Sequence, residues 1–305
     1  MAKLSLRDIR KRITSVRSTQ QITKAMKMVA AAKLRRAQEN IWAARPYATK
    51  ISEVLESLVA QTSPEAHPLL AGREERRVEL VLFTSDRGLC GAYNMNLIQR
   101  AERFLGEQKA LTHEVFFSFV GRKGRDYFRK RKAQVHREFI NFFGRVDYSF
   151  ASRIGQEVVL GFIEKQVDAI YLLYSEFRSA VQQRVILKKI LPVIPEISAE
   201  EGIASSPASA EEQPPKGTAA AEYLYEPSQM EILDKILPLY VEVQLYRGLL
   251  ESLASEYGAR MTAMENATNN AGEMIDKLTL VYNKARQAAI TKELIEIVSG
   301  AEALK

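Results

Sequence analysis

The sequence predicts an elongated α/β protein in which two long terminal helices pair as an antiparallel coiled coil and a small α/β domain lies between them. Residues 4–60 contain no Gly and one Pro, and residues 228–299 repeat apolar side chains at steps of three and four, so both segments have long-helix patterns. Residues 78–195 instead alternate short apolar runs with helical stretches, as βαβ units do. Sixty helical residues span roughly 90 Å, whereas a compact chain of 305 residues has a radius of gyration near ~19 Å. The molecule must therefore be elongated.

The first predicted element is a helix over residues 1–60, rich in Ala, Lys, Arg, Gln and Met. Its apolar residues form two stripes, which lie more than about 100° apart on the helix surface. The first stripe suits the partner helix. The second faces outward, where a third helix of the same chain or a larger partner must cover it. The first stripe is Leu6, Ile9, Ile13 and Val16, and the second is Ile22, Met26 and Val29.

Positive charge is concentrated in this helix. Residues 1–50 hold 13 Lys or Arg and two acidic residues, a net charge of +11, while the whole chain carries +7, so the other residues sum to −4. A basic segment indicates an acidic partner, such as nucleic acid, anionic lipid or an acidic protein surface, or simply a solvated helix face. Only Trp42 and Tyr47 offer aromatic rings for base stacking there, which weakens the nucleic-acid interpretation.

A connector, residues 61–77, leads into the predicted α/β domain, residues 78–195, which we expect to be Rossmann-like with a largely parallel sheet. Helices are predicted near residues 94–108, 122–132 and 150–166. Apolar runs predict four strands, at Val78–Phe83, Val115–Val120, Ala169–Tyr174 and Val181–Ile190. The last of these is expected at an edge of the sheet.

Residues 196–227 contain four prolines among Ser, Ala and Glu, which predicts a flexible linker. The last helix covers residues 228–305, with Pro238 as a predicted kink or boundary. Fifteen positions from Leu239 to Ala289 follow steps of three and four, and 14 of them are apolar when Tyr is counted, which is typical of a coiled-coil seam. A doubled step of four drifts from a strict heptad, so a uniform supercoil is not expected. Beyond Ala289 the apolar positions no longer follow the seam, which predicts a single helix held by an external partner. These positions are Ile290, Leu294, Ile297 and Ala301.

Composition excludes several classes of site. The single cysteine rules out a disulfide framework and a Cys-clustered metal site, and the three histidines, at 67, 113 and 136, have no i,i+4 partner. We therefore expect no metal and no cofactor. No apolar run approaches the ~18 residues that a membrane span needs, and the N-terminus has no apolar signal core. We expect a soluble intracellular chain.

The loop Thr84–Gly91 follows a predicted strand and precedes a predicted helix, as a phosphate-binding loop would. It lacks both G-x-x-x-x-G-K-[ST] and G-x-G-x-x-G, which favours a tight turn over nucleotide binding. Cys90 has no nearby constellation of His and acidic residues to orient it as a nucleophile. A nucleotide-dependent enzyme that uses residues 85–94 stays open as a less favoured function.

Three motifs, in the same order along the chain, resemble the gamma subunit of F-type ATP synthases. Residues 22–34 read ITKAMKMVAAAKL, and residues 85–94 read SDRGLCGAYN. The third motif has two parts near the C-terminus: residues 259–268 read ARMTAMENAT, and residues 280–294 read LVYNKARQAAITKEL. The resemblance covers the chain end to end apart from the linker at 196–220. A single cysteine and the absence of a transit peptide indicate the bacterial type rather than the chloroplast or mitochondrial type.

The resemblance implies a rotor shaft whose paired helices enter a ring of three alpha and three beta subunits, with its tip in an apolar collar. The α/β domain would form a foot with the epsilon subunit on the c-ring, which proton flow turns. Catalysis would occur on the beta subunits, so we expect a non-catalytic chain, one copy per complex, at the cytoplasmic face of the bacterial inner membrane. The residues expected to contact the alpha/beta ring are Lys24, Met26, Lys27, Arg286, Gln287, Thr291, Glu293, Leu294 and Ile297. Those expected to contact epsilon or the c-ring are Arg87, Cys90 and Tyr93.

A second function class remains, a basic coiled-coil nucleic-acid binder with an α/β body, whose affinity would fall steeply with salt. The contact residues also have plainer interpretations. Met26 is either ordinary coiled-coil core or an adaptable side chain at a changing contact. Arg286 and Gln287 are either solvated surface residues or contacts to an acidic loop of a beta subunit.

Overall fold

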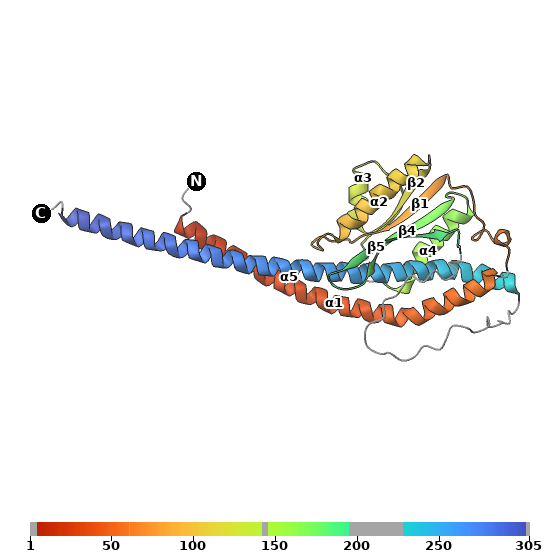
Figure 1. The fold of residues 1–305 in the computed structure, drawn as a ribbon, viewed down its shortest axis with the longest axis horizontal. Coiled ribbons are helices and arrows are strands. Elements are labelled where there is room, and N and C mark those ends of the chain that lie inside the picture. The colour runs from red at the N-terminus through yellow and green to blue at the C-terminus, as the bar shows by residue number, and fades with distance from the viewer. Residues whose placement is uncertain (1–4, 61, 142–145, 195–227, 303–305) are drawn as a thin grey trace.

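The computed structural model describes residues 5–60, 62–141, 146–194 and 228–302. Figure 1 shows a long two-helix shaft, with an α/β body packed against one end of it. Helix α1 spans Leu6–Ala60 and α5 spans Gln229–Glu302, and all the strands lie between them in the chain. The predicted fold class is confirmed.

The body is built on a five-stranded sheet with the order β3-β2-β1-β4-β5. Four strands are parallel, and β5 is antiparallel to β4 at one edge. The strands are β1 (Arg77–Phe83), β2 (Glu114–Val120), β3 (Gln134–Phe139), β4 (Ala169–Phe177) and β5 (Gln183–Leu191). The other helices are α2 (Tyr93–Ala110), α3 (Arg122–Arg129) and α4 (Tyr148–Ile163), with a 3-10 turn, η1, at Pro64–Ala66.

Strand β3 is a strand that the sequence pattern did not predict. It lies at the sheet edge and carries only two apolar residues, Val135 and Phe139, so no apolar run marks it. The other predicted strands are present, although the last begins at Gln183 rather than at residue 181. Helix α3 ends at Arg129, earlier than predicted, and Lys132 has a φ of 55°, which a helix cannot continue.

Pro238 lies inside α5, so the prediction of a boundary there is wrong. A proline in a helix interior costs ~3 kcal/mol or more. Leu233, Leu237 and Val241 are fully buried on both sides of it, and burying each such side chain contributes about 1.5–3 kcal/mol. Packing of this face against the body therefore outweighs the local cost.

Apolar cores cover both faces of the sheet. Helices α2 and α3 pack on one face around Phe104, Phe117 and Phe128. Helix α4 and the first half of α5 pack on the other face, where Leu237 and Leu245 join the core. Helix α5 is therefore both a shaft helix and one layer of the body.

Gly248 sets the distance between α5 and the sheet. A Cβ added there would lie 3.1 Å from the side chains of both Leu172 and Phe83, which is tighter than most carbon contacts in proteins. The absence of a side chain therefore allows α5 to lie directly on β4 and β1 (Figure 1).

The two shaft helices are antiparallel and pair along the predicted seam. Thr23 Oγ1 lies 2.8 Å from Thr268 Oγ1, and Gln20 Nε2 donates to Thr268 O at 3.4 Å. Ile9 of the first predicted stripe is buried, whereas Ile22 and Val29 of the second are exposed. The seam of α5 and the outward stripe of α1 both lie where the sequence places them.

Candidate functional site

The far end of α5 is a single exposed apolar helix. It continues beyond the start of α1 (Figure 1), and Ile290, Leu294 and Ile297 are 45%, 57% and 68% exposed. Ile295 and Val298, which the sequence analysis did not single out, are exposed beside them. At 100° per residue these five side chains cover about 160° of the helix circumference. We call this segment, residues 290–298, the tip.

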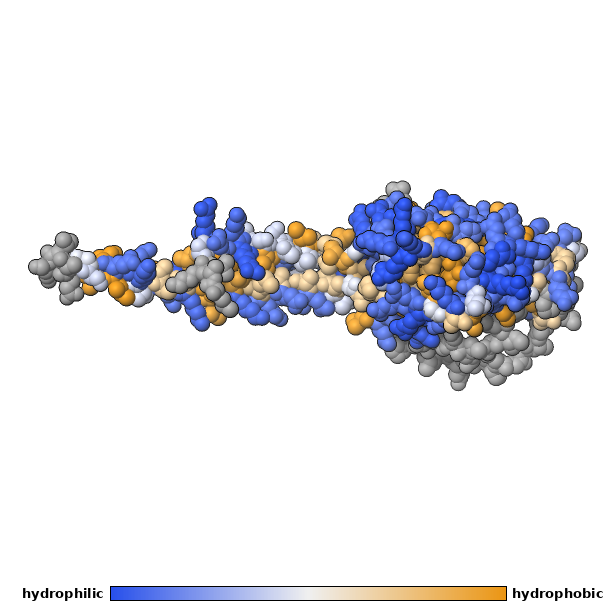
Figure 2. Space-filling view, turned by 90° about the horizontal axis from the view of Figure 1, so that it is seen from above, coloured by the Kyte–Doolittle hydropathy of each residue, from blue (hydrophilic) through white to orange (hydrophobic). Residues whose placement is uncertain are grey.

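Among the residues that the structure describes, none covers the tip, and Figure 2 shows apolar side chains exposed along the narrow end of the shaft. Contiguous exposed apolar surface of this kind marks a site of interaction with another molecule. Ala301 lies in the same helix, but its side chain is outside the described residues.

Polar contact residues lie at the base of the tip. Arg286 and Gln287 are exposed, and within the described part of the chain Arg286 makes no ion pair. Thr291 is also exposed, and its hydroxyl donates to Gln287 O at 2.9 Å, a bond that holds it against its own helix. Glu293 is exposed as well. This end of the shaft therefore presents a cation directly beside an apolar surface.

Farther down the shaft, Lys24 and Lys27 of the N-terminal motif differ. Lys27 Nζ donates to Glu265 Oε1 of α5 at 2.7 Å, while Lys24 is exposed and has no ion pair to another described residue. Since the Lys27–Glu265 pair is partly solvated, it contributes little to stability. Of these two lysines, Lys24 therefore stands open to a partner.

The loop between β1 and α2 is held in place by its own polar groups. Ser85 N donates to Asn94 Oδ1 at 3.0 Å, and the Ser85 hydroxyl donates to Arg87 O at 2.6 Å. Asp86 Oδ1 accepts from the backbone N–H of Arg122 at 3.0 Å. The loop is thus a fixed surface feature, with Leu89 exposed at its crest.

Cys90 and Tyr93 lie beneath this loop and are 1% and 4% exposed. Burial raises the pKa of the Cys90 thiol, and it also raises the pKa of Tyr93. The expected direct contact of these two residues with a partner is therefore incompatible with their positions, because both belong to the core. Of the three loop residues singled out from the sequence, only Arg87 is exposed.

A hydrogen bond from Arg260 fastens the loop to α5, and an ion pair within α5 holds Arg260 in place. Arg260 Nη2 donates to Gly88 O at 3.3 Å, and Arg260 Nη1 lies 2.6 Å from Glu256 Oε1. Burial raises the pKa of Glu256, and the charge and hydrogen bond of Arg260 oppose that rise. The sequence analysis missed this brace, although an acid and a base four residues apart on a helix are its usual signal.

A groove of about 540 Å³ runs between α1 and this loop. Met26, together with Ile22 and Val29 of the outward stripe, lines one wall, and Leu89 lines the other. The N-terminal and central motifs, more than fifty residues apart in the sequence, therefore meet on one surface.

In the described ranges, no group of His, Cys, Asp and Glu could hold a metal ion, and no helix has a stretch apolar enough to cross a membrane.

Comparison with known proteins identifies the family. A family model described as ATP synthase matches residues 5–304. The chain is 50% identical over 301 residues to the ATP synthase gamma chain of Geobacter metallireducens, with 99% of each chain covered. The chain belongs to the ATP synthase gamma chain family. It is also 45% identical to the gamma chain of Sorangium cellulosum, again with 99% of each chain covered.

Solved structures share the fold of this gamma chain. A chain in the Euglena gracilis mitochondrial ATP synthase structure of OSCP, F1 and c-ring aligns with a TM-score of 0.66 at 21% identity, over 98% of this chain and 94% of that one. A chain in the central stalk and c-ring structure from Tetrahymena thermophila aligns with a TM-score of 0.59 at 24% identity, over 81% and 99%. The paired helices and the body between them are therefore the architecture of this family.

Proposed function

We propose that this gamma chain is the central rotor shaft of an F-type ATP synthase, which couples proton-driven rotation of the c-ring to conformational change at the catalytic beta subunits. The uncovered apolar tip is the observation that carries the proposal. A helix with about 160° of apolar circumference needs an apolar partner to cover it, and a collar formed by a ring of subunits is such a partner.

The proposed partners are three alpha and three beta subunits around the shaft, with the epsilon subunit and the c-ring at the body. The tip residues Leu294 and Ile297 would enter the collar. The polar residues that would meet the ring are Lys24, Lys27, Arg286, Gln287, Thr291 and Glu293, with Met26 at the groove. At the foot, Arg87 would make the contact, supported from beneath by Cys90 and Tyr93. One copy of the chain would serve one complex.

The shape of the shaft supports the coupling. A pair of helices has no threefold symmetry, so each of three equivalent sites around it meets a different side of the shaft. Each site is then held in a different conformation, and rotation exchanges the three. We divide the chain accordingly into a shaft (1–60 and 228–305), a foot (78–195), a connector (61–77) and a linker (196–227).

The chain itself would be non-catalytic and would lie at the cytoplasmic face of the bacterial inner membrane. The loop 85–94 lacks the glycine spacing of a phosphate cradle, and its cysteine is buried. Titration calorimetry of the full chain with ATP should therefore show no binding at micromolar concentrations. Micromolar affinity would favour a nucleotide-dependent enzyme instead.

The decisive experiment combines the full chain with the alpha and beta subunits of its host. We expect native mass spectrometry to find three alpha, three beta and one copy of this chain. A bead attached to the body should turn in steps of about 120° during ATP hydrolysis, because the sites are related by threefold symmetry. Failure to assemble, together with DNA or RNA binding that weakens steeply with salt, would replace the rotor with the nucleic-acid binder.

A further inference from the structure

A second cavity lies on the shaft beside α4, away from the tip and from the groove at the central loop. It has a volume of about 300 Å³, opens to solvent on one side and is lined by α1, α5 and the first turn of α4. Its floor is formed by the buried side chains of Val243, Gln244 and Leu250 of α5. Ala44 and Ala48 of α1 also line it, and their small side chains leave the space unfilled. This size lies at the lower end of the range for small-molecule sites.

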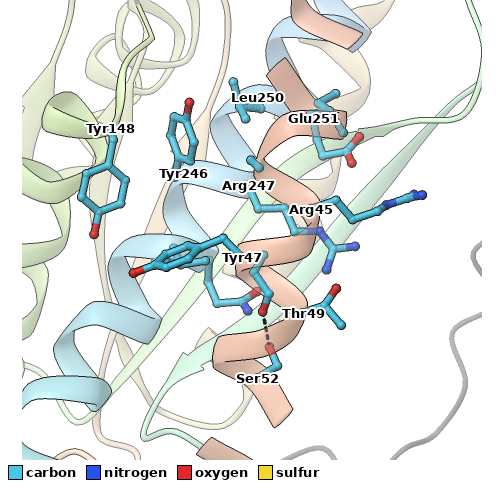
Figure 3. Close-up of a pocket in the computed structure, with 14 residues that line it drawn as sticks. Arg45, Tyr47, Thr49, Ser52, Tyr148, Tyr246, Arg247, Leu250 and Glu251 are labelled. Atoms are coloured by element: carbon cyan, nitrogen blue, oxygen red, sulfur yellow. Dashed lines mark hydrogen bonds between the residues drawn. The ribbon is translucent and has the colours of Figure 1, made fainter. Parts of the chain in front are cut away.

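One end of the cavity is aromatic. Tyr47, Tyr148 and Tyr246 line it from three different helices, and Figure 3 shows the Tyr47 ring extending toward Tyr148. The rings of Tyr148 and Tyr246 meet edge to face, with centroids 5.7 Å apart and planes at 79°. The Tyr148 hydroxyl donates to Glu242 Oε2 at 2.8 Å, which fixes that ring. A planar aromatic ring finds both faces and edges to pack on here.

The other end is cationic. Arg45 and Arg247 extend side by side in Figure 3, and neither forms an ion pair or hydrogen bond with another residue of the described chain. Glu251 lies beside them, but its Oε2 already accepts from Phe177 N at 2.9 Å. Burial raises the pKa of Glu251, and the charges of Arg247 and Arg45 act against that rise. Two guanidinium groups beside one engaged carboxyl leave an excess of positive charge.

We propose that this cavity binds a small planar aromatic anion, with its ring against Tyr47 and Tyr148 and its acidic group on Arg45 and Arg247. Guanidinium groups pair with carboxylate, sulfonate or phosphate oxygens in a planar, bidentate geometry. The aromatic and cationic ends together select a ligand that carries both features. A neutral aromatic molecule would leave the guanidinium groups unpaired, and a small inorganic anion would leave the rings unfilled.

Such a ligand would bridge the shaft to the body. The cavity walls come from α1, α4 and α5, so a molecule bound there contacts all three helices at the junction. Binding to the folded state alone raises stability, by about 2.7 kcal/mol at a ligand concentration one hundred times Kd. The proposal is independent of the rotor function, because it concerns binding by the full chain.

The test uses 8-anilinonaphthalene-1-sulfonate as the probe and N-phenyl-1-naphthylamine as its neutral counterpart, which has the same rings without the sulfonate. Fluorescence titration of the full chain should show one saturable site for the sulfonate. The double variant Arg45→Gln, Arg247→Gln should weaken sulfonate binding at least tenfold and change binding of the neutral probe less than twofold. The variant Ala48→Phe, which fills the cavity, should abolish binding of both probes while circular dichroism stays unchanged.

Two controls separate this site from other surfaces. Arg103→Gln, an exposed arginine on α2, should leave the affinity for the sulfonate unchanged. Leu294→Ala with Ile297→Ala should also leave it unchanged, because the exposed tip is another surface on which the probe can adsorb. Sulfonate affinity that is unaffected by the paired arginine substitutions, or saturable binding that survives Ala48→Phe, would overturn the proposal. Tighter binding of an acidic tyrosine-containing peptide than of the sulfonate would assign the cavity to a protein partner and overturn it too.

Discussion

The apolar tip offers the sharpest test of the rotor assignment, through the double variant Leu294→Ala, Ile297→Ala. These side chains are 57% and 68% exposed in the free chain, and fully burying such a side chain contributes about 1.5–3 kcal/mol. The surface still available to a collar is therefore worth about 1–2 kcal/mol for each residue and ~2–4 kcal/mol for both. Since 1.4 kcal/mol is tenfold in affinity, retention of the chain in the ring should weaken by about 30- to 700-fold.

The assay measures the affinity of the full chain for the assembled alpha and beta subunits, beside thermal unfolding of the free chain. Because exposed positions contribute little to folding, the free energy of unfolding should change by less than ~0.5 kcal/mol. Leu160→Ala is the matched control, since Leu160 is 55% exposed on α4 and far from the tip in the fold. Unchanged affinity of the double variant, or an equal loss from Leu160→Ala, would refute the reasoning.

Two further predictions concern charged residues. Arg286→Ala should lower ATP turnover of the assembled complex by up to about tenfold, if it removes an interface pair of ~1.4 kcal/mol, with assembly intact. Arg103→Ala should leave turnover unchanged, and equal turnover for both variants at equal assembly would remove the assigned role of Arg286. Arg137→Met should lower the free energy of unfolding by about 3–5 kcal/mol, because it removes the guanidinium group that lies 2.6 Å from the fully buried Glu79 carboxylate and leaves only His136 and Ser118 beside that charge.

The stability loss caused by Arg137→Met should depend on pH. Burial favours the protonated form of Glu79, but His136, Arg137 and Ser118 outweigh it and hold the pKa of Glu79 below its ordinary value of 4.5. In the native chain this carboxylate therefore contributes stability above pH ~4.5, which is lost as the pH falls through the folded-state pKa. Removing the charge and hydrogen bond of Arg137 raises the pKa of Glu79 in the folded variant above its native value, so protonation costs the folded variant less than the native chain. The stability deficit of the variant should therefore shrink as the pH falls from 7 to 4 in urea unfolding, and a deficit that grows would contradict the electrostatic account.

Periodicity predicted most of the fold, because each long helix carries its packing surface as a repeated pattern. The stripe from Leu6 to Val16 and the seam from Leu239 to Ala289 needed only the helical repeat to be recognised. Strand β3 was missed because an edge strand exposes its residues, and its polar side chains His136 and Arg137 contact the buried Glu79 carboxylate on another strand. The helix boundary predicted at Pro238 was wrong for a different reason. The cost of a proline inside a helix can be read from the sequence, whereas the packing of the surrounding helix face against the body, which outweighs that cost, cannot.

By itself, the sequence determined the elongated shape, the two stripes of α1 and the uncovered tip, because these depend on helix length and residue spacing within one element. Only the tertiary structure decided that Cys90 and Tyr93 are buried, that Arg260 braces Glu256 and the central loop, and that three tyrosines and two arginines enclose one cavity. Each of these depends on which residues of separate elements meet across the fold. Like the packing of α5 onto the sheet at Gly248, they are contacts between distant parts of the chain, which no local pattern encodes.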